Sequence, residues 1–124
     1  MQADVEKTRQ YYQAIGPGEL CSCKDCKNYY AQVKAAYPAV AGYLAELGVD
    51  IEKPLETSPL DPGADGMLEY GACQYVVLGR CEEDYCHTVG KVEVRRAVFY
   101  PATGVEAEHF VLELSPIRLK AWQE

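Results

Sequence analysis

Three cysteines lie within six residues, at Cys21, Cys23 and Cys26. The two-residue spacing between Cys23 and Cys26 lets two thiolates converge on one metal ion, and Cys21 can approach from the segment before them. Zinc is the leading candidate because soft thiolate ligands favour it. The sequence therefore predicts a structural zinc site that includes these three cysteines.

A tetrahedral zinc site needs a fourth ligand. The segment Cys81-x₄-Cys86-His87 is the expected donor, because a loop at the end of a sheet can reach the start of a helix. Cys73 is less favoured since it lies within a predicted strand. The predicted ligand set thus adds Cys81, Cys86 and His87 to the first three cysteines. An iron–sulfur cluster is an alternative occupant, although the spacing matches no common ferredoxin run.

Two other interpretations of the cluster remain open. Cys23 and Cys26 have the spacing of a thiol–disulfide motif at a helix start, where the helix dipole lowers a thiol pKa. A thioredoxin-like motif follows a β-strand, however, and here a turn at Gly16-Pro17-Gly18 precedes it. Alternatively, the cysteines are buried without chemistry, since free cysteine is often buried.

The element that positions the cluster is a predicted helix from Cys23 to about Tyr37. Ser22 followed by Asp25 resembles a capping box and predicts Ser22 as the N-cap. Lys24, Lys27 and the helix N-terminus would stabilise thiolates there. The apolar stripe of this helix is predicted at helical spacing, over Cys26, Tyr30, Val33 and Tyr37.

The rest of the chain predicts an α+β fold with three N-terminal helices packed on a three-stranded antiparallel β-meander. The other helices are expected over 3–15 and 39–47, and Gly48 is expected at the C′ position. The strands are expected over 67–78, 89–100 and 105–114. One domain over 1–124 is predicted, made of a helical half 1–48, a crossover loop 49–66, the meander 67–115 and a tail 116–124, whose Leu119 and Trp122 fold back onto the core.

Composition narrows the function classes. The 124 residues carry a net charge of −7, which argues against binding nucleic acid and suits a basic protein partner, as for an inhibitor or immunity-type protein. No apolar run is long enough to cross a membrane, so no membrane partner is expected. The first seven residues lack a signal-peptide pattern, which predicts a cytoplasmic protein. No catalytic motif is recognisable, so an enzyme is the less favoured class. The sequence predicts no oligomeric state.

Overall fold

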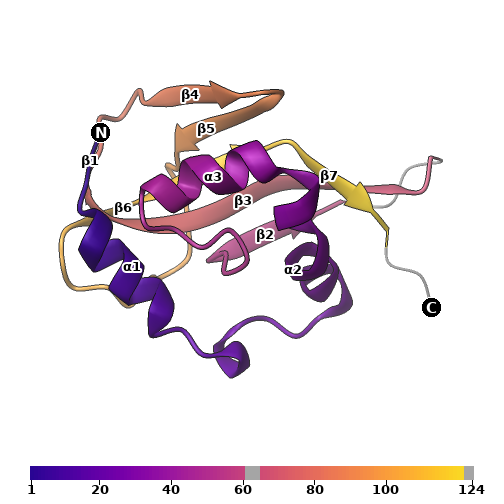
Figure 1. The fold of residues 1–124 in the computed structure, drawn as a ribbon, viewed down its shortest axis with the longest axis horizontal. Helices are drawn as coiled ribbons and strands as arrows, with labels where there is room; N and C mark the ends of the chain where they lie inside the picture. Colours follow the sequence, from indigo (N-terminus) through magenta and orange to yellow (C-terminus); the bar gives the residue numbers. More distant parts are fainter. Residues whose placement is uncertain (61–64, 122–124) are drawn as a thin grey trace.

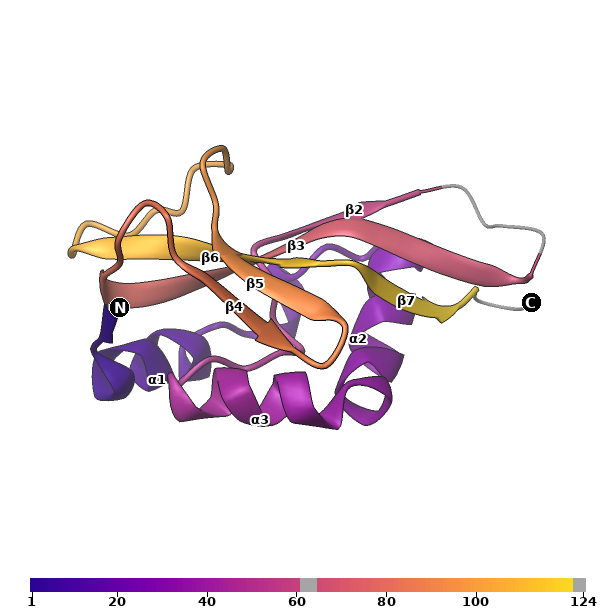
Figure 2. The same ribbon diagram turned by 90° about the horizontal axis from the view of Figure 1, so that it is seen from above.

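The structure, a computed structural model, describes residues 1–60 and 65–121, and its main feature is a curved antiparallel sheet. The elements in chain order are β1 (Gln2–Ala3), α1 (Val5–Gln13), the short 3₁₀ helix η1 (Pro17–Glu19), α2 (Lys24–Ala36), α3 (Pro38–Glu46), β2 (Glu56–Pro59), β3 (Met67–Arg80), β4 (Cys86–Val89), β5 (Val92–Arg96), β6 (His109–Ser115) and β7 (Ile117–Lys120). The three α-helices lie together on one face of the sheet (Figures 1 and 2).

The 14-residue strand β3 organises the sheet, because four other strands pair with it along its length. β1 and β2 lie along one side of β3, while β6 and β7 lie along the other. β5 then pairs with β6, and β4 pairs with β5 at the edge. All these pairings are antiparallel, and the sheet curves into a half-barrel with the helices against its concave face (Figure 2).

The predicted three-stranded meander is therefore wrong. The described residues form a seven-stranded sheet, in which β1, β2, β4 and β7 are the additional strands. Each of these has two to four residues, which is too short to show an alternating pattern in the sequence. β2 also lies inside the proline-rich crossover, where Pro59 is tolerated at the end of a strand that pairs on one side only.

The predicted strand over 89–100 is also wrong in extent. Gly90, with a φ of +61°, turns the chain between β4 and β5, and β5 ends at Arg96. Val98 and Phe99 were expected to continue a strand, but 78% and 86% of their surfaces are exposed. The loop that carries them rises on the side of the sheet opposite the helices (Figure 2).

Other strand predictions are confirmed in part. Phe110, Leu112 and Leu114 are buried in β6 as expected, although the strand begins at His109 instead of at residue 105. Leu119 is buried in β7, as the prediction for the tail requires, and Trp122 lies outside the described residues.

The three helices occur where the sequence predicts them, and their ends have identifiable causes. Asp4 caps α1 by accepting a hydrogen bond from the Lys7 N–H. Pro38 is tolerated in the first turn of α3, because backbone N–H groups in the first turn of a helix have no acceptor within the helix. The absence of an N–H at Pro38 therefore breaks no helical hydrogen bond. Gly48 follows α3 with a φ of +86°, as expected for a C′ glycine. No helix within the described ranges is long and apolar enough to cross a membrane.

The main core lies between the helices and the concave face of the sheet. It includes Tyr29 and Val33 of α2, Leu44 of α3, and Tyr75 and Leu112 of the sheet, all completely buried. A smaller cluster on the opposite face contains Val76, Leu78, Ala97 and Val111. Burial on both faces explains why residues 73–78 of β3 are continuously buried and do not alternate.

We expect Gly48→Ala to destabilise the protein by more than Gly90→Ala does. Both glycines have positive φ, but a Cβ at Gly48 would lie 2.4 Å from the Val5 carbonyl oxygen, whereas nothing lies within 4 Å at Gly90. The φ penalty is about 1 kcal/mol at each site, and the clash at Gly48 adds about 1–3 kcal/mol. Equal losses in urea unfolding free energy would contradict the close approach of α1 to Gly48.

Candidate metal centre

The three clustered cysteines lie at the start of α2. Cys21 and Cys23 belong to the segment between η1 and α2, and Cys26 lies in the first turn of the helix. Their Sγ atoms all lie within 4.8 Å of one another. In a tetrahedral zinc site with Zn–S bonds of about 2.3 Å, sulfur atoms are about 3.8 Å apart. A metal ion thus needs inward shifts of about 1 Å or less from these side chains.

The N-cap of α2 is Cys23, and the prediction of Ser22 is wrong by one residue. Cys23 has an extended backbone (φ −67°, ψ 160°), and its Sγ accepts a hydrogen bond from the Cys26 N–H at 3.4 Å. A sulfur thus takes the place that a serine or aspartate oxygen usually takes at a helix start. The Cys23 Sγ consequently lies at the positive end of the helix dipole.

The pKa values of the Cys23 and Cys26 thiols are shifted in opposite directions. The hydrogen bond from the Cys26 N–H lowers the pKa of the exposed Cys23 thiol. Burial raises the pKa of Cys26 to about 12, and the Thr57 hydroxyl, 3.4 Å from the Cys26 Sγ, offsets only part of this rise. One sulfur is therefore prepared for deprotonation, whereas the other needs a cation to displace its proton.

Buried polar contacts fix the first turn of α2 on the sheet. Tyr70 of β3 is fully buried, and its hydroxyl donates to the Asp25 carbonyl oxygen at 2.5 Å. Burial raises the Tyr70 pKa to about 12, so this hydroxyl keeps its proton as a donor. Asn28 donates to the Tyr70 hydroxyl at 3.3 Å and to the Lys120 carbonyl oxygen at 3.0 Å. The helix start is thereby tied to β3 and β7.

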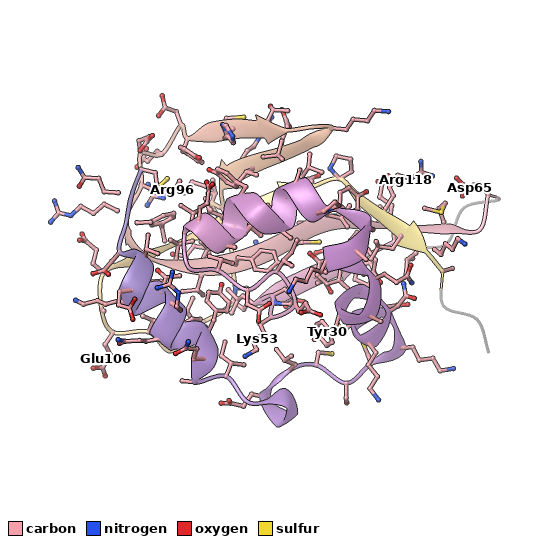
Figure 3. The ribbon with its side chains drawn as sticks, viewed as in Figure 1. Tyr30, Lys53, Asp65, Arg96, Glu106 and Arg118 are labelled. Carbon is pink, nitrogen blue, oxygen red and sulfur yellow. The ribbon has the colours of Figure 1, made fainter. Side chains whose placement is uncertain are left out.

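Two further contacts hold the flanks of the cluster. The hydrogen bond between Thr57 and Cys26 links the helix to β2, and Thr57 is buried. On the other flank, the Tyr30 hydroxyl donates to the Cys21 carbonyl oxygen at 3.1 Å (Figure 3). Tyr30 thus connects the segment that precedes α2 to the helix itself. Contacts on both sides of the cluster therefore keep the three sulfur atoms close together.

The predicted apolar stripe of α2 is only partly correct. Cys26 and Val33 are buried as predicted, but Tyr30 and Tyr37 are only half-buried. Asn28 and Tyr29 are buried instead, because the helix faces polar contacts at its start and the hydrophobic core further on.

The structure places Cys81 away from the cluster. Its Sγ donates to the Glu82 carbonyl oxygen at 3.4 Å, and its own carbonyl accepts from Arg96 at 3.1 Å. Figure 3 shows Arg96 well apart from Tyr30, whose hydroxyl contacts the Cys21 carbonyl oxygen, and Cys81 is not in the described group of converging sulfurs.

Cys86 and His87 are also placed elsewhere, on the edge strand β4. Cys86 is exposed opposite Arg95 of β5, and the His87 ring stacks on Tyr43 of α3 with ring centroids 4.8 Å apart. Cys73 is completely buried within β3. In the part of the chain that the structure describes, the only group of three or more potential metal ligands is Cys21, Cys23 and Cys26.

Three residues position the site without having been predicted from the sequence: Thr57, Tyr70 and Asn28. One signal was present, because Asn28 lies between Cys26 and Tyr29 on a helix face that the structure buries. A buried asparagine needs hydrogen-bond partners, which points to polar groups across from it. Nothing local in the sequence marks Thr57 or Tyr70, whose roles depend on strand pairing.

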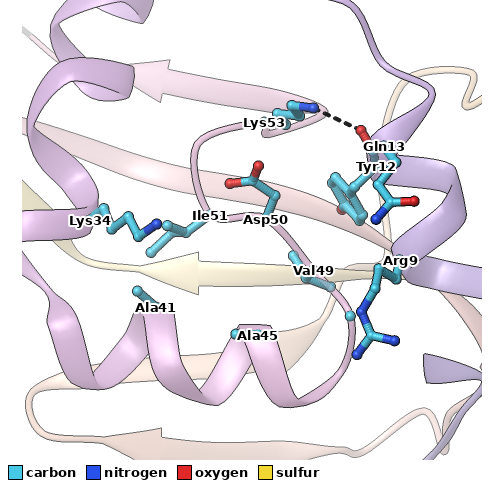
Figure 4. A pocket seen from close by; sticks show the side chains of 11 residues that line it. Arg9, Tyr12, Gln13, Lys34, Ala41, Ala45, Val49, Asp50, Ile51 and Lys53 are labelled. Atoms are coloured by element: carbon cyan, nitrogen blue, oxygen red, sulfur yellow. Dashed lines mark hydrogen bonds between the residues drawn. The ribbon is translucent and has the colours of Figure 1, made fainter. Parts of the chain in front are cut away.

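A separate cavity of about 290 Å³ lies between α1, α3 and the segment that follows α3 (Figure 4). Arg9 and Lys53 line it, and both are engaged by the protein itself. Lys53 donates to the Tyr12 carbonyl oxygen at 2.8 Å, near the C-terminus of α1, and Arg9 pairs with Glu6 at 2.7 Å. This cavity is consequently a weaker candidate for a functional site than the cysteine cluster.

No protein-family model, curated protein or solved structure matches the chain. The geometry of the site is therefore the basis for the functional conclusion.

We expect iodoacetamide to modify Cys23 at least about tenfold faster than Cys26 in the metal-free protein near pH 8, because alkylation requires a thiolate. The Cys23 rate should fall as pH drops through its lowered pKa, and its midpoint should lie below that of the same cysteine in urea. A Cys21→Ser background isolates Cys23, and trypsin cleavage after Lys24 separates Cys26 for mass spectrometry. Faster modification of Cys26 would contradict the burial described above.

Proposed function

We propose that the protein binds zinc through the thiolates of Cys21, Cys23 and Cys26. The observation that carries this proposal is the convergence of three sulfur atoms within 4.8 Å at a helix N-terminus. Packing alone does not require such convergence, because Cys21 and Cys23 are exposed to solvent and contribute nothing to the core.

The electrostatics of the site support a divalent cation. Three thiolates and one Zn²⁺ carry a net charge of −1, and the helix N-terminus partly offsets it. Lys24 and Lys27 add positive charge in the first turn. The cation also supplies the attraction that deprotonates Cys26, whose pKa is raised by burial. Protons therefore compete with the metal, and zinc affinity should fall as pH decreases.

The same cysteines could instead hold an iron–sulfur cluster or form a redox pair of Cys23 and Cys26. The local geometry favours zinc over a thioredoxin-like pair, because the segment before α2 contains η1 and no strand. A metal at this position would link the segment before α2 to a helix start that is already fastened to three strands.

Single serine substitutions test the proposal. We expect Cys21→Ser, Cys23→Ser and Cys26→Ser each to weaken zinc binding at least tenfold, measured by competition with a chromophoric chelator under reducing conditions. The matched control is Cys86→Ser, which removes another exposed cysteine and should leave zinc affinity unchanged. Substoichiometric zinc in the parent protein, or equal losses for Cys86→Ser, would contradict the proposal.

A specific surface feature favours a second candidate function, the binding of a basic protein partner. Val98, Phe99 and Tyr100 are three of the four exposed large hydrophobic residues of the described chain, and they are consecutive. Monomeric proteins rarely leave such a contiguous apolar segment exposed without a use for it. The loop 97–108 contains no basic residue, and of its two acidic residues Glu108 pairs with Arg80 at 2.7 Å. The hollow beside Val98 and Phe99 is lined by three acidic and two basic residues, Glu83, Asp84, Glu113, Arg95 and Arg96, and the whole chain carries −7. An apolar segment whose neighbours carry a small acidic excess suits a partner that presents basic and aromatic side chains.

We expect a displayed random-peptide library to yield basic, aromatic-containing binders. A synthetic copy of such a peptide should lose at least tenfold in affinity for Phe99→Ser, and higher salt should weaken its binding to the parent protein. Leu60→Ser is the matched control, because Leu60 is exposed but lies outside this loop. Acidic binders, or binding that Phe99→Ser does not change, would contradict this function.

A further inference from the structure

The cysteine cluster supplies three of the four ligands that a tetrahedral metal ion takes. The predicted donors of a fourth ligand lie elsewhere, since His87 stacks on α3 and the Cys81 backbone contacts Arg96. Across the described ranges 1–60 and 65–121, no further histidine, cysteine or carboxylate joins the group. Within these described ranges the protein thus supplies three ligands, and one coordination position is left for another group.

The direction of that position follows from burial. The Cys26 Sγ faces the protein, where it contacts the buried Thr57 hydroxyl. Cys21 and Cys23 are exposed and lie on the solvent side of the first turn of α2. A metal held by one inner and two outer sulfurs would therefore lie near the surface, on the side of the exposed Cys21 and Cys23.

We propose that this fourth position is exchangeable and accepts the thiolate of an external small molecule. This inference rests on the proposed zinc-binding function and specifies the class of ligand that the site takes. The step would be a ligand exchange without oxidation or reduction: Cys21, Cys23 and Cys26 would hold the ion, and the incoming thiolate would replace a water ligand, which would leave to solvent. A metal held in this way is a site for exchange, unlike a closed structural site with four protein ligands.

The charge around the cluster favours an anionic sulfur ligand. A fourth thiolate raises the charge of a zinc site to −2, which needs nearby positive charge. The site offers the N-terminal end of a 13-residue helix together with Lys24 and Lys27, two exposed cations in its first turn, against one acidic residue there, Asp25. The softness of the sulfur donor also favours a thiolate as the fourth ligand, because zinc binds thiolate more readily than it binds carboxylate.

Cobalt(II) as a spectroscopic substitute for zinc tests this inference on the full-length reduced protein. One equivalent of Co²⁺ should give the absorption bands of a tetrahedral site with sulfur-to-metal charge transfer. Added glutathione should then increase the charge-transfer intensity and shift the visible bands, while S-methylglutathione, which lacks a thiolate, should change neither. Lys27→Glu should weaken the glutathione effect several-fold, and Lys34→Glu, near the other end of α2, should not.

The outcomes separate the two claims. Failure of the parent protein to bind Co²⁺ would overturn both the zinc-binding function and the ligand inference. Cobalt bound at one equivalent without a glutathione response would overturn the inference alone. A complex of one metal with two chains would also overturn the inference, because a second copy of the chain would then fill the fourth position. Loss of cobalt from the protein to glutathione during dialysis would overturn it as well.

Discussion

The hydrogen bond from the Tyr70 hydroxyl to the Asp25 carbonyl oxygen, at 2.5 Å, is the contact on which the cysteine cluster most depends. It joins the central strand β3 to the first turn of α2, at the residue immediately before Cys26. Asn28 completes the contact by donating both to Tyr70 and to the backbone of β7. Buried polar groups are costly when unpaired, so this arrangement stabilises one position of the helix strongly over others.

One side of the cysteine cluster is packed against the protein, and the other side is exposed to solvent. Cys26 is buried against Thr57, which fixes one sulfur relative to the sheet. Cys23 caps the helix with its sulfur, and its exposed side chain can still turn towards a cation. A serine would cap a helix at least as well as cysteine does. Helix stability alone therefore does not account for a cysteine at the N-cap.

The sequence predicted the local cysteine cluster and the three helices, but it predicted neither the extent of the sheet nor the residues that position the cluster. Cysteine spacing within one short segment is local information, and it placed Cys21, Cys23 and Cys26 together correctly. The fold prediction failed where structure depends on distant pairing: β2 exists because Thr57 pairs opposite Cys73, and β7 because Leu119 pairs opposite Leu68. Short strands of this kind leave no periodic signal in the chain.

The difference between local sequence signals and contacts made by distant segments also explains the individual errors at the site. The N-cap was assigned to Ser22 because serine is a preferred capping residue, but the backbone enters the helix one residue later. The expectation for Cys81, Cys86 and His87 assumed that a loop at a sheet end reaches the helix start. The curvature of the sheet instead brings β4 against α3, where His87 stacks on Tyr43.

X-ray absorption at the zinc edge of the loaded, reduced protein would count the sulfur ligands of the bound ion. We expect three sulfur ligands at about 2.3 Å and one lighter ligand, a water or another oxygen or nitrogen donor, at about 2.0–2.2 Å. A coordination shell without sulfur, or one with four sulfurs from a single chain, would contradict this expectation.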